Sequence, residues 1–253
     1  MGQLFFSGTG VPLSKPEDVI PFLGRKTHWK EGRSAFEVAY TWFEAQDIPK
    51  SIRSVLETDP TFQNATLEKA FFEKQTELDR YRGPSQTDVL AILRIASGIA
   101  LLGIEAKVDE SFGQLVKDWE DGSESKKQRL AGLVKRLELD DNAVGQLRYQ
   151  LLHRTVATLI EAERHGASEA AMIVQSFCPR HTGFSDFQLF AAKVTRFWGD
   201  DDYEFWVQVP SASVPKLAFE LLREKFSGQL DAVDAFRAWC RTHDVQHEFD
   251  SWI

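Results

Sequence analysis

Three charged side chains stand at the ends of segments that are otherwise apolar. Asp88 opens one apolar run, and the next apolar run ends in Glu105-Ala106-Lys107. Side chains alternate along a strand, so Glu105 and Lys107 point to the same face if this run is a strand. Burying such charges is costly unless they pair or serve a site. These positions therefore suit either an ion-paired rim of a sheet or an active site built from two acids and a lysine.

The same acid-x-lysine spacing occurs again at Glu124-Ser125-Lys126. The spacing by itself decides nothing, because composition alone yields triplets of this kind. Glu124 and Lys126 lie in a strongly polar stretch that is typical of a solvated helix face. Glu105 ends an apolar run instead, so the context favours the first triplet as the functional one.

A hairpin between the two apolar runs would bring Asp88 to the triplet. A turn at Ser97-Gly98 sets Asp88 opposite Lys107. A turn at Ala96-Ser97 sets Asp88 opposite Glu105. Both registers place the three charged groups on one face, whereas a three-residue turn centred on Ser97 would separate them.

The spacing of apolar residues predicts how the rest of the chain supports these strands. Ser34 and Glu37 have the spacing of a capping box, which predicts a helix start at Ser34. The strand at 70–79 is inferred mostly because the proposed sheet needs one. The chain contains no internal repeat or low-complexity linker, so residues 1–253 are expected to form one domain, with residues 1–24 irregular. Strands are expected at 70–79, 88–93, 99–107, 170–177 and 203–209, and helices at 111–139, 143–163, 185–197, 214–226 and 230–240.

The charge balance argues against a role with nucleic acid. The net charge is −8 and the pI about 5.3, whereas proteins that bind polyanions are usually basic. The basic residues do cluster, in 25–33 and 126–136, which favours a solvated surface but also suits a phosphate track. The two cysteines have no metal-binding spacing and no apolar run could cross a bilayer. A cytoplasmic protein without membrane contact is therefore expected.

Asp88 on one strand, the Glu105-Ala106-Lys107 triplet on the next, and a helix and strand after them resemble the PD-(D/E)XK nuclease superfamily. The resemblance covers about residues 34–177. It implies a restriction-endonuclease-like α/β fold, in which an α-β-β-β-α-β core forms a mixed central sheet flanked by helices. The last third, about 178–253, matches nothing in that core and is expected to be a mostly helical addition. Thr87 stands where many members carry a proline, which lowers the specificity of the match.

The resemblance implies a metal-dependent nuclease that uses Mg²⁺ or Mn²⁺. Asp88 and Glu105 resemble the two metal-binding carboxylates, and the backbone carbonyl of Ala106 would be a further ligand. Lys107 resembles the lysine that orients the attacking water. A hard cation held by oxygen ligands neutralises charge on the phosphate and acidifies a water, which explains these residue types.

Three further residues would support this site by the same resemblance. Glu37, on the first helix, stands where some members carry an extra metal-facing acid, although the capping box is an alternative role for it. Gln150 and Arg154 lie one turn apart on the helix that often contributes to the site. The implied partner is nucleic acid, DNA before RNA, and a homodimer is compatible with the family. The competing hypothesis is a binding or regulatory module that keeps the fold without catalysis.

Overall fold

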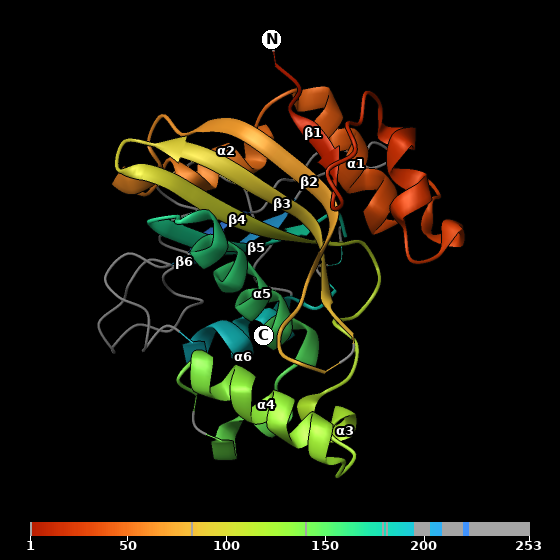
Figure 1. Cartoon of the computed structure of the whole chain (residues 1–253), viewed down its shortest axis with the longest axis vertical. Coiled ribbons are helices and arrows are strands. Elements are labelled where there is room, and N and C mark those ends of the chain that lie inside the picture. Colours follow the sequence, from red (N-terminus) through yellow and green to blue (C-terminus); the bar gives the residue numbers. More distant parts are fainter. Residues whose placement is uncertain are drawn as a thin grey trace.

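The computed structural model describes residues 2–81, 83–139, 141–178, 180, 182–194, 203–208 and 220–222. Its centre is a seven-stranded mixed sheet in which the strands follow one another in chain order, from β1 to β7. Helices lie on both sides of this sheet, and a smaller helical lobe lies beyond one end of it (Figure 1). The α/β class with a mixed sheet flanked by helices, predicted from the sequence, is confirmed.

Antiparallel and parallel pairings alternate in blocks across the sheet. Strands β2, β3 and β4 form an antiparallel meander, and β6 pairs with β7 in the same way. The pairs β1–β2, β4–β5 and β5–β6 are parallel. The strands are β1 (Phe5–Ser7), β2 (Thr66–Thr76), β3 (Ser85–Ile95), β4 (Gly98–Lys107), β5 (Glu169–Ser176), β6 (Tyr203–Gln208) and β7 (Glu220–Leu222).

Six α-helices and four short 3-10 helices connect these strands within the described residues. The α-helices are α1 (Ser34–Ala45), α2 (Lys50–Leu56), α3 (Val116–Trp119), α4 (Glu124–Arg136), α5 (Tyr149–His165) and α6 (Phe184–Val194). Helix α5 ends at Gly166, whose left-handed conformation (φ 61°) forms the predicted glycine cap. The 3-10 helices span Pro16–Phe22, Lys26–His28, Pro60–Phe62 and Asp141–Gln146.

The two faces of the sheet bury different sets of side chains. On one face α1 and α2 pack on a continuous apolar core that includes Val89, Ile104 and Ala106. On the other face α5 packs against the same strands, over residues such as Leu90 and Leu101. The alternation of side chains along β3 and β4 produces this division. A third apolar cluster joins α4, α5 and α6 in the helical lobe.

Several predicted boundaries differ from the structure. The segment 1–24 was expected to be irregular, but it contains β1, which is too short to produce a periodic pattern. The helix expected over 143–163 begins at Tyr149, after a 3-10 helix, and the helical stretch expected over 111–139 is divided into α3 and α4. Residues 220–222 form β7 inside the helix expected over 214–226. The rest of that helix and the one expected over 230–240 lie outside the described residues.

The start of α1 also differs from the capping-box prediction. The helix begins at Ser34, but Arg33 is its N-cap, and no side chain caps it. The Glu37 side chain accepts a hydrogen bond from the Gly32 backbone N–H instead, at 2.9 Å. Within the described residues no helix is both long and apolar enough to cross a membrane.

Candidate functional site

The β3–β4 hairpin places Asp88 beside Glu105. Ile95 pairs with Gly98 across the hairpin, so the turn consists of Ala96 and Ser97, the second of the two predicted registers. The same register pairs Val89 with Ile104, and one step further it sets Asp88 opposite Glu105. Asp88 Oδ2 accepts a hydrogen bond from the Ala106 N–H at 2.7 Å. Local hairpin geometry therefore joins the two acids.

Glu105 is the most enclosed acid of the site and is held from two elements. Its side chain is only 2% exposed. Oε1 accepts hydrogen bonds from Lys107 Nζ at 2.6 Å and from Gln150 Nε2 at 2.7 Å. Oε2 accepts one from Arg154 Nε at 2.5 Å. A single carboxylate thus organises the lysine of β4 and both predicted residues of α5.

A glycine lets α5 approach β4 closely enough for these contacts. Gly103 lies two residues before Glu105 on the face that α5 covers, and a Cβ built on it would lie 1.9 Å from Thr158 Oγ1. Any larger residue would push α5 outward. Since Gln150 and Arg154 reach Glu105 from that helix, the empty position at Gly103 is part of what positions the site.

Lys107 is also buried, with 4% of its surface exposed. Besides the ion pair with Glu105, its ammonium lies 5.1 Å from the centre of the Phe112 ring, a cation–π contact. Burial of a lysine is tolerable only with partners of this kind. The ammonium is therefore fixed in place next to the acids instead of being solvated.

A third acid, Glu73 of β2, joins the group and was not identified from the sequence. The pairs Phe72–Val89 and Lys74–Thr87 flank it, so Glu73 lies opposite Asp88. Its signal was present in the chain, because Glu73 follows an apolar segment of its strand just as Glu105 does. The identification failed because only the β2–β3 pairing reveals that the two acids are neighbours.

The backbone at Glu73 is unusual for a strand. Its φ is +58°, a conformation that costs free energy for any residue other than glycine and that is often found at functional sites. Gly8, which directly follows β1, lies against this point, and its N–H donates to the Phe72 carbonyl at 2.6 Å. A Cβ on Gly8 would lie 2.4 Å from the Glu73 carbonyl oxygen. The lack of a side chain at Gly8 thus permits this close approach.

The three acids of this cluster differ in their proton affinity. Burial, together with the charges of Glu105 and Glu73, raises the pKa of Asp88 well above its usual range. Burial also raises the pKa of Glu73 to about 7. Burial would raise the pKa of Glu105 too, but the charges and hydrogen bonds of Arg154 and Lys107 outweigh it and lower this pKa to about 2. Arg154 and Lys107 thus keep Glu105 ionised, whereas Asp88 and Glu73 hold their protons to higher pH.

Few side chains of the cluster could bind a cation. Among the described residues, no three His, Cys, Asp or Glu side chains converge so that they could hold a metal ion. Asp88 and Glu105 remain as the two-carboxylate set, and Mg²⁺ is typically held by one or two carboxylates together with water and substrate oxygens. The Ala106 contact that the structure describes is made by its N–H, which donates to Asp88.

Glu37 is not part of this cluster. It lies on α1, which packs on the opposite face of the sheet from α5. Its carboxylate is buried and serves the Gly32 backbone N–H. The predicted approach of Glu37 to the acids is therefore not seen, whereas the predicted approach of Gln150 and Arg154 is. Whether Glu37 reaches the acids depends on the face of the sheet on which α1 packs. The sequence pattern of α1 does not indicate that face.

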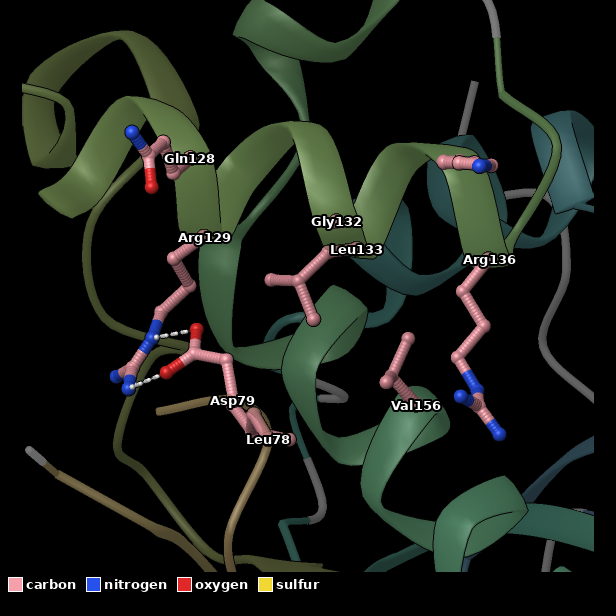
Figure 2. Close-up of a pocket in the computed structure, with 9 residues that line it drawn as sticks. Leu78, Asp79, Gln128, Arg129, Gly132, Leu133, Arg136 and Val156 are labelled. Carbon is pink, nitrogen blue, oxygen red and sulfur yellow. Dashed lines mark hydrogen bonds and ion pairs between the residues drawn. The ribbon is translucent and has the colours of Figure 1, made fainter. Parts of the chain in front are cut away.

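One basic residue of α4, Arg129, lies beside the connection between β2 and β3. Arg129 Nε and Nη2 donate to the two oxygens of Asp79, each at 2.8 Å, and Figure 2 shows this fork reaching from α4. Arg129 also donates to the carbonyls of Tyr81 and Gly83. The predicted basic group 126–136 therefore includes a clamp that fastens the β2–β3 connection to α4, so it is only partly a solvated surface.

The comparisons with known proteins give a family but no activity. Residues 12–203 match the family described as a domain of unknown function, DUF6946, and the chain belongs to this family. The matched span contains every residue of the acidic cluster together with α5 and the clamp of α4. No curated protein and no solved structure matches the chain.

Proposed function

We propose that this member of the DUF6946 family hydrolyses phosphodiester bonds of nucleic acid with a divalent cation, Mg²⁺ or Mn²⁺. The observation that carries the proposal is the grouping of three acids on neighbouring strands, where Asp88 lies between Glu73 of β2 and Glu105 of β4. Acids with raised pKa values destabilise a fold at neutral pH, and such groups concentrate at functional sites.

The residues present fit a hard cation at Asp88. Within the described parts of the chain, no lysine, arginine or histidine forms a salt bridge with Asp88 or Glu73, whereas Lys107 and Arg154 both pair with Glu105. A divalent cation would relieve the repulsion between these acids, and it would supply Lewis acidity toward a phosphate oxygen and a water. Asp88 and Glu105 would be its protein ligands, as the family resemblance implies.

The remaining groups of the cluster have roles that follow from their contacts. Arg154 keeps Glu105 ionised, and Gln150 fixes the orientation of its carboxylate. Lys107 presents a buried ammonium that can orient a water and stabilise negative charge. Glu73, with a pKa near 7, is the acid best suited to accept or release a proton near neutral pH.

A second candidate is a binding or regulatory module that keeps this fold without catalysis. Both oxygens of Glu105 are engaged by Lys107, Gln150 and Arg154, which resembles a closed ion-pair network. The net charge of −8 also favours this candidate. The two candidates differ in what Asp88 contributes, because a closed network has no need of an acid with a raised pKa.

A cleavage assay distinguishes the two candidates. The purified chain is incubated with labelled single- and double-stranded DNA and RNA in the presence of Mg²⁺ or Mn²⁺, and the products are separated on gels. We expect cleavage that EDTA abolishes. Asp88→Asn and Lys107→Met should each lower the rate at least ~100-fold, because transition-state stabilisation by a metal site amounts to several kcal/mol.

Glu124→Gln is the matched control, because Glu124 belongs to the second acid-x-lysine triplet and lies exposed on α4. This variant should cleave like the unmodified chain. Cleavage that survives Asp88→Asn would show that the cluster is not the catalytic centre. If no substrate is cleaved and calorimetry detects no Mn²⁺ binding that Asp88→Asn removes, the binding module replaces the nuclease.

A further inference from the structure

An aromatic hollow lies next to the acidic cluster and has no role in the proposed chemistry. Its volume is about 350 Å³, within the range of about 300–1,000 Å³ that is usual for small-ligand sites. The β2–β3 connection, α3, α4 and the first turns of α5 form its walls. The side chains that matter for its chemistry are Tyr81, Trp119, Lys126, Arg129, Tyr149 and His153.

Aromatic rings dominate one wall of this hollow. The rings of Trp119 and Tyr149 stack with centroids 3.7 Å apart and planes 11° from parallel. The His153 ring lies 4.8 Å from that of Tyr149. All three side chains are only partly buried. The Lys126 ammonium also lies over the Trp119 ring, 5.1 Å from its centre, so a flat ring that stacks on this pair would take the place of that cation.

The two cations of the hollow are already neutralised. Lys126 donates to the Trp119 carbonyl at 2.6 Å and forms an ion pair with Asp121 at 2.9 Å. Arg129 is engaged by the carboxylate of Asp79. A phosphate would find little uncompensated positive charge here, so the hollow suits a neutral, flat group better than an anion.

His153 supplies one directed hydrogen bond to this space. Its Nδ1 lies 2.9 Å from Ser85 Oγ, and Ser85 Oγ accepts a hydrogen bond from Arg154 Nη1 at 2.9 Å. Ser85 is buried, and His153 Nδ1 is the acceptor that the described residues provide for its hydroxyl proton. Burial and the Arg154 charge lower the pKa of His153 to about 3, so the ring is neutral. Its proton is then on Nε2, to which no described residue is bonded.

We propose that this hollow binds one unpaired nucleobase of a nucleic-acid substrate, stacked on Trp119 and Tyr149, with His153 Nε2–H donating to an acceptor on the base. The proposal rests on the nuclease function and deepens it. The path Ser85–Arg154–Glu105 connects the hollow with the acidic cluster through direct hydrogen bonds. A base held there would therefore lie on the side of the acidic cluster from which Arg154 reaches Glu105.

The substrate class follows from this geometry. In a duplex both faces of a base are covered by its neighbours, so a base can enter an aromatic stack only when it is unpaired or flipped out. Single-stranded or frayed nucleic acid is therefore the preferred substrate. Continuous duplex is disfavoured, because unstacking a base from it costs a few kcal/mol.

Binding to short oligonucleotides tests this inference without relying on cleavage. Fluorescence anisotropy is measured with the full chain in EDTA and a labelled deoxyadenosine tetranucleotide. Trp119→Leu and Tyr149→Leu should each weaken binding by roughly 5- to 100-fold, the effect of about 1–3 kcal/mol per stacked base. An abasic tetramer of the same charge should bind as weakly to the unmodified chain as the normal tetramer binds to these variants.

Conservative and distant variants complete the test. Tyr149→Phe keeps the ring and should bind normally, whereas His153→Leu should lose affinity and His153→Gln, which retains a donor, should lose less. Phe36→Leu removes one ring of a comparable stack, Phe36–Tyr40 on α1, and should leave binding unchanged. Thermal unfolding of each variant shows whether it is folded.

The outcomes separate this inference from the proposed function. Equal binding of the normal and abasic tetramers, or unchanged binding by both leucine variants of the stack, would overturn the nucleobase site even if the chain cleaves. Base-dependent binding through the hollow, without any cleavage and without Mn²⁺ binding that Asp88→Asn removes, would support the site and refute the nuclease. A duplex of the same sequence that competes as well as the single strand would contradict the substrate class.

Discussion

The two faces of the central sheet are built from the same strands and yet serve opposite purposes. On the α1 face, Val89 and Ile104 pack into an apolar core. On the α5 face, the residues next to them, Asp88 and Glu105, belong to a charged cluster. Apolar side chains would be less costly to bury than charged ones on either face. The α1 face therefore carries stability, and under the proposed function the charges of the α5 face serve the chemistry.

The largest effect should come from removing the acid that balances the buried cations. Glu105→Gln leaves Lys107 and Arg154 buried without their partner, which should lower the free energy of unfolding by about 3–5 kcal/mol at pH 7. Urea denaturation followed by circular dichroism measures this. Exposed Glu124→Gln is the control. If the free energy of unfolding fell by less than ~1 kcal/mol, the charges of the α5 face would be solvated. The contrast drawn between the two faces would then be wrong.

The same acid has a defined pH dependence. Because the pKa of Glu105 is lowered to about 2 in the folded chain, its stabilising contribution is complete above the usual value near 4.5 and is lost as the pH falls toward 2. The unmodified chain should therefore lose stability in this window, and Glu105→Gln should lose less. Parallel slopes for both proteins between pH 4.5 and 2 would contradict the assignment.

A smaller effect is expected from adding a side chain between β4 and α5. Gly103→Ala places a Cβ against Thr158 and should destabilise the fold by about 1–3 kcal/mol. It should also lower cleavage, since α5 carries Gln150 and Arg154. Adding Thr158→Ala removes the nearest atom and should recover part of both losses. If the double variant is no better than Gly103→Ala, close helix approach is not what positions the site.

Glu73 should make stability depend on pH in the opposite direction to Glu105. Its pKa of about 7 in the folded chain exceeds the usual value near 4.5, so ionising it costs stability as the pH rises from 4.5 to 7. Glu73→Gln removes this cost and should raise stability by about 1–2 kcal/mol at pH 8, with solvent screening reducing the full effect of the shift. At pH 4 the two proteins should be alike.

Cleavage provides the second readout for Glu73. If the acid exchanges a proton near neutral pH, Glu73→Gln should flatten the rise of the rate around pH 7 while the protein becomes more stable. A variant that is more stable and equally active at every pH would make Glu73 a structural acid. A variant that is less stable at pH 8 would show that its charge is satisfied in the fold.

The smallest effect should come from the polar pair inside the α1 face. Trp42 Nε1 donates to Gln175 Oε1 at 3.2 Å, but Gln175 Nε2 is buried without a partner among the described residues. Gln175→Leu removes this unsatisfied group but leaves the buried Trp42 Nε1–H without its acceptor, so stability should fall by only about 1 kcal/mol. Cleavage should be unchanged. Loss of cleavage in a folded Gln175→Leu protein would show that the α1 face takes part in the site.

The pattern of residues close together in the chain predicted several strands, one helix and the position of the charged cluster. Periodicity located β3, β4, β5 and α5, because the burial of one face leaves a repeating mark on neighbouring residues. The Asp88 and Glu105-Ala106-Lys107 pattern indicated which strand ends carry the charged cluster, since charge at the end of an apolar run is costly without a partner. Two-residue turns gave two registers that keep the acids on one face, and a three-residue turn centred on Ser97 remained as an alternative that would separate them.

Only the tertiary structure decided which of those registers forms and which distant groups join the cluster. Glu73 reaches Asp88 through the β2–β3 pairing, and Arg154 reaches Glu105 because Gly103 admits α5. Glu37 is excluded because α1 packs on the other face. His153 faces an aromatic hollow assembled from four separate elements. Contacts between residues far apart in the chain leave no periodic signal in one sequence, so packing alone settles them.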